Sequence, residues 1–230
     1  MEACKRAIEI DPNFPPAQAN LAWTYLALEN YAEAETTVRQ AAERKLVVPD
    51  LLILPYFLAF YKGDRAGMES SAAQARNSPG GADWITNVGA FVLAYEGHLQ
   101  QARTMTRRAR DLAAQAHQTE RAATFEAGAA VREALFGNAS GAKQRAQAAL
   151  ELSKNRDVEY GAAFALAAVG DSVKSRVLVD DLNNRFPEDT CVRFTYLPVV
   201  RAIIALNSGK PSEAIEFLKQ KSVELDRVEM

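Results

Sequence analysis

The sequence has little of what marks a membrane protein, a disulfide-stapled protein or a metalloprotein. It holds two cysteines, Cys4 and Cys191, and two histidines, His98 and His117, none of them at the spacing of a metal site. The longest apolar run, residues 51–61, is about half the length that a membrane span needs. The N-terminus has no apolar segment typical of a signal peptide. We therefore expect a cytoplasmic protein with no metal, no cofactor and no membrane contact.

An excess of positive charge is missing as well. Lysine and arginine number 27 against 29 aspartates and glutamates, which gives a net charge of −2. This balance excludes a broadly basic nucleic-acid-binding protein, so we predict no nucleic-acid partner. The basic run Arg103, Arg107, Arg108 and Arg110 is better interpreted as the solvated face of a helix, because a phosphate-binding patch would need aromatic or further basic neighbours.

Catalytic motifs are also absent. The chain contains no glycine-rich phosphate loop, and neither cysteine has a visible partner base. The fragment Arg156-Asp157-Val158 lacks the histidine and the asparagine of a kinase catalytic loop, so we expect a polar link that ends in a helix N-cap. We predict no catalytic residue and no enzyme activity in this chain.

What the chain does contain is helix formers, with 42 alanines among its 230 residues. No sustained alternation of apolar and polar residues predicts a strand, so we expect an all-α fold. Short polar turns recur at intervals of 33, 34, 40, 33 and 39 residues. Their markers are Asn30, Gly63, Gly97, Gly137, Gly170 and Gly209. A unit near 34 residues predicts repeated helical hairpins.

Small residues follow the same period. The position seven before each glycine is held by Tyr56, Ala90, Ala130, Ala163 and Ala202, and Ala22 is at the equivalent place in the first hairpin. The position five after each glycine is held by Met68, Ala102, Ala142, Ser175 and Ala214, with Ala34 equivalent in the first hairpin. Seven residues further on lie Ala41, Ala75, Ala109 and Ala149, and the pattern of small residues fails at Leu182 and Lys221. Small side chains at fixed offsets predict helices that cross closely, because side-chain bulk sets the distance between helix axes.

Residues 15–46 resemble the tetratricopeptide repeat. Leu21 and Ala22 stand where the family has its Leu-Gly pair, and Tyr25 matches the aromatic of the first helix. Tyr31, Ala34 and Ala41 match packing positions of the second helix, and Pro12 matches the closing proline of a preceding repeat. The resemblance implies an α-solenoid of antiparallel helical hairpins, wound as a right-handed superhelix.

We expect one solenoid domain over residues 1–230, with about six hairpins after a leading half-repeat at 1–13 and before a tail at 226–230. The expected hairpins are 14–48, 49–79, 80–116, 117–155, 156–188 and 189–225. The chain opens in the middle of a repeat and leaves Ala3, Ala7 and Ile8 uncovered, so we expect a fragment of a longer protein.

A wider resemblance concerns residues 49–52, 63–68, 132–138 and 185–190. They are similar to the region after the kinase domain of some bacterial, notably acidobacterial, serine/threonine protein kinases, and to tails of winged-helix regulators. The resemblance implies one alternative function, a regulatory fragment whose kinase or regulator activity lies outside this chain. Another alternative is a structural spacer or dimerisation stack, and the oligomeric state stays open.

The expected functional surface is the inner face of the first helix in each hairpin, which lines a concave groove in tetratricopeptide arrays. The position six before each turn glycine is apolar throughout, with Phe57, Phe91, Val131, Phe164 and Ile203, and Trp23 is the corresponding residue of the first hairpin. We take Trp23, Phe57, Phe91 and Phe164 as groove candidates, together with Asn20 and Asn87.

Two interpretations of this column stay open, a groove floor and a core between repeats. The peptide-carboxylate clamp of the family needs Lys, Asn and Arg on this face, and only Asn20 and Asn87 approach that chemistry. We predict a non-catalytic interaction module that binds a protein or peptide segment, or another domain of its parent protein, in the groove.

Overall fold

The computed structural model describes the backbone of residues 1–228 and the side chains of residues 1–219, and every regular element in that part of the chain is a helix. This confirms the all-α prediction. The helices form two compact units, Met1–Gly97 and His98–Met230, and each is described by itself. Of the expected tail at 226–230, the last helix covers residues up to Val228, and residues 229–230 lie outside the described part.

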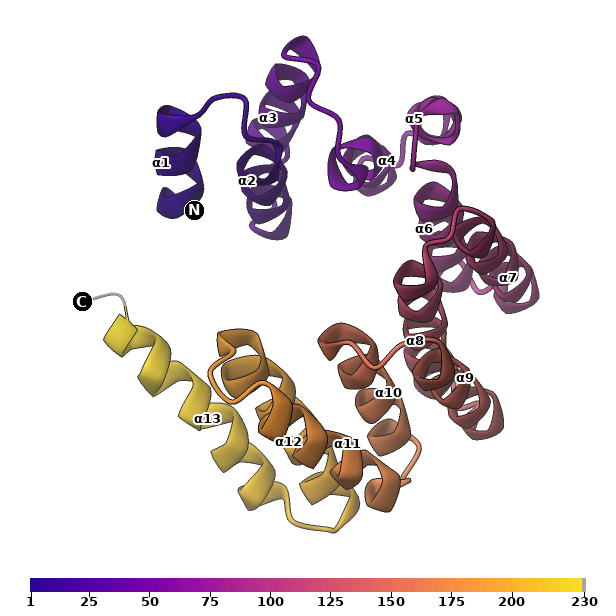
Figure 1. Cartoon of the computed structure of the whole chain (residues 1–230), viewed down its shortest axis with the longest axis vertical. Coiled ribbons are helices and arrows are strands. Elements are labelled where there is room, and N and C mark those ends of the chain that lie inside the picture. Colours follow the sequence, from indigo (N-terminus) through magenta and orange to yellow (C-terminus); the bar gives the residue numbers. More distant parts are fainter. Residues whose placement is uncertain (229–230) are drawn as a thin grey trace. The chain divides into compact units, whose positions relative to one another are not determined.

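The first unit is a succession of short helices joined by tight turns (Figure 1). These are α1 (Glu2–Ile10), α2 (Pro15–Ala27), α3 (Tyr31–Glu43), α4 (Pro49–Tyr61), α5 (Arg65–Asn77) and α6 (Ala82–Tyr95). Helices α2 and α3 pack as one hairpin and α4 and α5 as the next, while α4 also contacts α2, α3 and α6. Helix α1 packs on α2 but has no buried residue.

The second unit continues the same scheme with longer helices. They are α7 (Leu99–Gln115), α8 (Thr119–Leu135), α9 (Ala139–Leu152), α10 (Arg156–Ala168), α11 (Ser172–Arg185), the π-helical η1 (Val192–Tyr196), α12 (Leu197–Asn207) and α13 (Pro211–Val228). Helix α10 packs on both helices of the preceding hairpin, α8 and α9, and on its own partner α11. Each hairpin thereby covers the apolar stripe of the one before it.

A residue with positive φ closes the first helix of each hairpin turn. Glycine holds this place in most turns, at Gly63, Gly97, Gly137, Gly170 and Gly209. In the first hairpin the residue is Glu29, with φ of 60°, while Asn30 is the N-cap of α3. The marker at Asn30 was therefore one residue late. The amide of Asn30 donates to the carbonyl of Tyr25, the six-to-one hydrogen bond of a Schellman motif.

Side-chain caps and prolines define where helices begin. Pro15 and Pro49 occupy the first turn of α2 and α4, where the missing amide proton costs no intrahelical hydrogen bond. Asp64 caps α5 by accepting a hydrogen bond from the amide of Gly67 at 2.9 Å. Asn155 caps α10 in the same way through the amide of Val158. Arg156, Asp157 and Val158 therefore form the first turn of α10 and not the polar link expected from the sequence.

The alanine columns form the centre of the packing, as predicted. Ala22, Ala130 and Ala163 are fully buried in the packed clusters of their hairpins, and Ala90 is fully buried as well. The two columns on the second helices are buried as well, at Ala34, Ala102, Ala142, Ser175, Ala214, Ala41, Ala75, Ala109, Ala149 and Leu182. Met68 differs, since it is only half-buried. Larger apolar side chains then fill the space between hairpins, as Leu54 and Leu58 do beside Ala22.

Bulk at an alanine crossing should be costly. Ala22→Leu should lower the free energy of unfolding by about 1–3 kcal/mol, because the added side-chain atoms cannot fit without separating the helices. Ala32→Leu, at an exposed position of α3, is the control and should change stability by less than about 0.5 kcal/mol. Urea denaturation followed by circular dichroism measures both, and equal losses would contradict a close helix crossing at Ala22.

Candidate functional site

Two residues of the inner column meet in the first unit. Trp23 of α2 and Phe57 of α4 make an edge-to-face contact with ring centroids 5.3 Å apart. Both are half-buried and pack against the buried clusters that contain Leu54 and Ile53. The indole Nε1 of Trp23 donates a hydrogen bond to Oδ1 of Asp50 at 3.1 Å, which fixes the ring. The pair therefore joins two successive repeats and keeps part of its surface accessible.

The third residue of the column, Phe91, is more accessible. It lies on α6 and is 41% exposed, whereas Val88 and Val92 of the same helix are buried. A large aromatic side chain with this exposure can contact a partner. Phe91 is thus the most exposed of the three aromatic side chains at this repeat position in the first unit.

The two candidate asparagines have different surroundings. Asn20 is exposed on α2. Asn87 of α6 is 7% exposed, and its side-chain Oδ1 has no hydrogen-bond partner in the part of the chain that the structure describes. A buried acceptor without a donor costs about 1–3 kcal/mol. Asn87 precedes Phe91 by one helical turn and shares its face of α6. An unsatisfied acceptor therefore lies next to an accessible ring.

The remaining candidate, Phe164, belongs to the second unit and to a different aromatic set. It is half-buried on α10 and contacts the ring of Tyr160 edge-to-face at 6.2 Å. Tyr160 in turn stacks on Tyr196 of η1, with centroids 3.8 Å apart and ring planes 6° apart. Tyr160 and Tyr196 were not among the sequence-predicted groove residues, because only one position of each repeat was considered. The four-residue spacing of Tyr160 and Phe164 could have indicated Tyr160, because residues four apart share a helix face.

Polar groups hold the stacked tyrosine in place. The hydroxyl of Tyr196 donates to Oδ1 of Asp157 at 2.7 Å, and Arg156 bridges Asp157 to Asp189, with its Nη1 2.7 Å from Oδ2 of Asp189. Burial favours the neutral acid, but the hydrogen bonds from Arg156 and Tyr196 outweigh it and lower the pKa of Asp157. The Arg156-Asp157 pair of the sequence is thus a structural ion pair.

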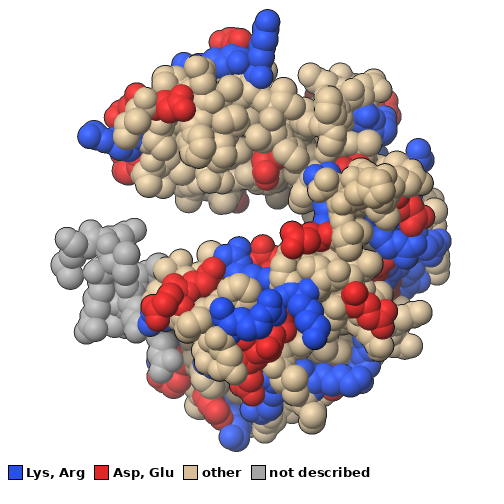
Figure 2. Space-filling view, viewed as in Figure 1, with Lys and Arg blue, Asp and Glu red and all other residues tan. Residues whose placement is uncertain are grey.

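The arginines of α7 are also used for packing. In the second unit Arg103 forms two hydrogen bonds of 2.7 Å to the carboxylate of Glu133. Glu126, which is 2% exposed, receives Arg110 at 3.3 Å and Arg145 at 2.8 Å. The hydrogen bonds from Arg103 lower the pKa of Glu133. Blue and red side chains accordingly alternate on the visible face of this unit (Figure 2). Paired in this way, Arg103 and Arg110 offer no phosphate-binding patch.

One carboxylate of the second unit has a strongly raised pKa. Glu159 of α10 is 1% exposed, and its burial, followed by a hydrogen bond shared with Asp181, raises its pKa to about 7. Arg185 opposes the shift with its Nη1 3.1 Å from Glu159 Oε2, and Lys154 opposes it more weakly. The same hydrogen bond and Arg185 lower the pKa of Asp181. The two acids therefore titrate far apart.

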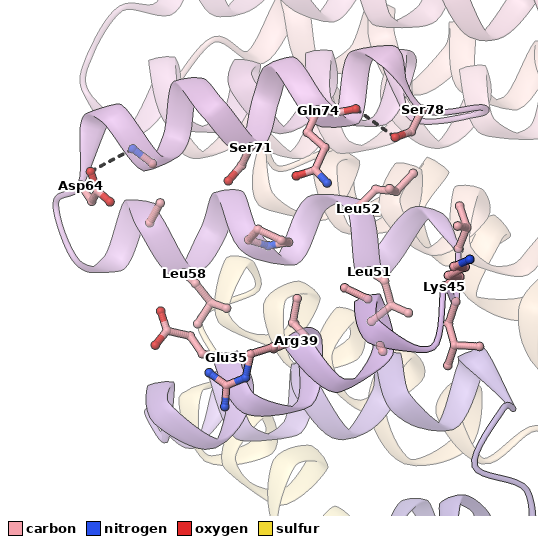
Figure 3. Close-up of a pocket in the computed structure, with 18 of the residues that line it drawn as sticks. Glu35, Arg39, Lys45, Leu51, Leu52, Leu58, Asp64, Ser71, Gln74 and Ser78 are labelled. Atoms are coloured by element: carbon pink, nitrogen blue, oxygen red, sulfur yellow. Dashed lines mark hydrogen bonds between the residues drawn. The ribbon is translucent and has the colours of Figure 1, made fainter.

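A large cavity lies in the first unit beside α4 (Figure 3). It has a volume of about 750 Å³ and is bounded by α3, α4 and α5. Leu51, Leu52, Pro55 and Leu58 of α4 form its floor. Residues three and four apart share a helix face, so Phe57 projects away from this floor. The sequence reasoning did not find this cavity.

No group of three or more His, Cys, Asp or Glu side chains that could hold a metal occurs within the described residues. Cys4 is half-buried and Cys191 is exposed. None of the helices in the described part combines the length and the apolar character needed to cross a bilayer.

Comparison with known families agrees with the fold. Residues 1–47 match the family model described as tetratricopeptide repeat, which supports the assignment to that family and covers α1, α2 and α3. A comparison with curated proteins found no match. The chain is thus an all-α helical-repeat protein of the solenoid class, with tetratricopeptide repeats at its N-terminus. Such repeats generally mediate protein–protein interaction and are typically non-catalytic.

The raised pKa of Glu159 predicts a pH dependence of stability. In the unfolded chain the pKa is near 4.5, so the folded state holds a proton more tightly and is favoured at low pH. This contribution should be present below pH 4.5 and should be lost as the pH rises to about 7. Glu159→Gln keeps the neutral shape and should remove this part of the pH dependence. Urea unfolding between pH 4.5 and 8 measures it, and identical profiles would contradict the assignment.

Proposed function

We propose that this chain is a non-catalytic interaction module that binds an apolar protein segment along the inner helix faces of its first unit. The observation that carries the proposal is that the aromatic side chains at one repeat position differ in their exposure to solvent. Trp23 and Phe57 form a fixed aromatic pair, and Phe91 presents an accessible ring at the same offset two helices on. Rigid aromatic anchors dominate the energy of many interfaces.

The polar neighbours support a peptide as the partner. Asn20 is exposed on the helix that carries Trp23, whereas Asn87 is buried beneath the face that carries Phe91. A main-chain amide of a bound segment can donate to the side-chain oxygen of Asn20, while apolar side chains contact the rings. The segment could equally be part of a longer parent protein, since binding in cis uses the same contacts.

Phe91 is the residue to test. A peptide selected from a random display library against the whole chain should bind Phe91→Ala about 2 kcal/mol or more weakly, because an accessible aromatic anchor is removed. Fluorescence anisotropy with the labelled peptide measures the affinity, and thermal unfolding is recorded in parallel. Phe14→Ala, at an aromatic residue that is 47% exposed before α2 and outside the inner column, is the matched control and should bind almost as the parent chain does.

Two results would contradict the proposal. If Phe91→Ala lowers the melting temperature but leaves the affinity per folded molecule unchanged, the column is core and not a binding surface. If no peptide is enriched over the library background, the role of a spacer is favoured instead. A phosphotransfer assay on the chain should remain at background in either case.

A further inference from the structure

The cavity between α3 and α5 has an equivalent position in the second unit, between α9 and α11. Helix α9 begins after the N-cap Asn138 as α3 begins after Asn30, and α11 begins after Asp171 as α5 begins after Asp64. Counting from these caps, Leu150 corresponds to Ala42 and Leu178 to Ser71. Counting back from the turn glycines, Leu166 of α10 corresponds to Ala59 of α4.

The corresponding space is smaller in the second unit than in the first. In the second unit Leu150, Leu166 and Leu178 pack together, and the space left beside them is about 400 Å³. In the first unit the corresponding side chains are Ala42, Ala59 and Ser71, all of which line the cavity of about 750 Å³. Each replacement of leucine by alanine or serine removes most of an apolar side chain and leaves that volume open.

Two residues of α4 are larger than their counterparts in α10. Pro55 and Leu58 stand where α10 has Ala162 and Ala165. Bulk at these positions holds α3 away from α4, because side-chain size sets the interaxial distance. Helix α3 accordingly packs less extensively on α4 than α9 does on α10. The first unit therefore has larger side chains on α4, at Pro55 and Leu58, and smaller side chains on the neighbouring helices, at Ala42 and Ser71.

The two walls differ in their polar groups. Helix α5 contributes small or neutral polar residues, among them Gly67, Ser71, Gln74 and Ser78 (Figure 3). The α3 wall and its following loop carry cations at Arg39 and Lys45. Neither cation lies within ion-pairing distance of a carboxylate among the residues whose side chains are described, and both are exposed.

The acidic groups at the rim are already engaged. Glu35 pairs with Lys62, and Asp64 accepts the capping hydrogen bond of Gly67. The charge left over at the rim is therefore positive. An occupant with carboxylates fits that rim, and its aliphatic side chains fit the floor.

We infer that this cavity is a second docking site and that it binds an acidic peptide segment with leucine side chains. The leucines of the segment take the volume that Leu150, Leu166 and Leu178 occupy in the second unit. The carboxylates meet Arg39 and Lys45, and Ser71 and Gln74 offer hydrogen bonds to the peptide backbone. A simple fatty acid has no backbone to use these last two groups. The site is independent of the inner face that carries Trp23 and Phe91.

The chain itself supplies the variant that tests the inference. Ala42→Leu with Ser71→Leu copies Leu150 and Leu178 into the first unit and should fill the cavity. The matched control is Gln40→Leu with Ala73→Leu, which adds leucines at exposed positions of the same two helices away from the cavity. The probe is a labelled short peptide of alternating leucine and glutamate, and fluorescence anisotropy reports its binding to the whole chain.

The filled variant should bind the probe at least about tenfold more weakly than the parent chain, while the control variant binds it unchanged. Arg39→Glu with Lys45→Glu, both at exposed positions, should weaken binding of the probe to a similar degree. Phe91→Ala should leave the affinity for the probe unchanged, which separates this site from the inner face. Circular dichroism and melting curves show whether each variant is folded.

Three outcomes would overturn the inference. The first is equal binding of the probe to the filled variant, the control and the parent chain. The second is equal binding to the parent chain of the acidic probe and a matched peptide of leucine and lysine, since the rim would then select no charge. The third is binding of decanoate without binding of the acidic peptide, which would make the cavity a site for an aliphatic carboxylate.

Discussion

Close crossing of helices at small residues is the constraint on which the rest of this structure depends. Ala22, Ala130 and Ala163 are fully buried, and their small side chains allow neighbouring helices to approach closely, while a residue with positive φ ends the first helix of each hairpin. Once these distances are fixed, the side chains around each crossing must fill whatever space is left. Binding surfaces can arise only where that filling is incomplete.

The two units fill this space by different means. In the second unit Glu126 and Glu133 are buried and satisfied by arginines from α7 and α9, and leucines close the space beside α10. A buried acid is tolerated only when such partners compensate its desolvation. The first unit uses aromatic rings instead, with Trp23 against Phe57 and Tyr31 stacked on Tyr61. The cavity beside α4 lies where Ala42, Ala59 and Ser71 replace the leucines of the second unit.

Much of the fold could be predicted from the sequence because its determinants are local. The turn period and the alanine offsets predicted the helices and the buried columns, and glycine identified every turn except the first, where Glu29 takes the positive φ that usually favours glycine. The accessible state of Phe91 and the stacking of Tyr160 on Tyr196 were not predictable in this way. Both depend on how neighbouring hairpins pack, which one repeat position does not encode. The cavity was missed for the same reason, since it follows from the absence of three leucines.

A repeat protein offers an internal reference that a single-core protein lacks. Because Ala42, Ala59 and Ser71 have counterparts at the same distance from the same caps and turns, the open space beside α4 can be attributed to particular side chains. Pro55 and Leu58 show that the difference is not a loss of bulk alone, since α4 is larger than α10 at those two positions. A hairpin that had merely lost packing residues would be expected to collapse toward its neighbour. Here the larger residues of α4 oppose that collapse, so the cavity persists as a feature that the sequence of this unit maintains.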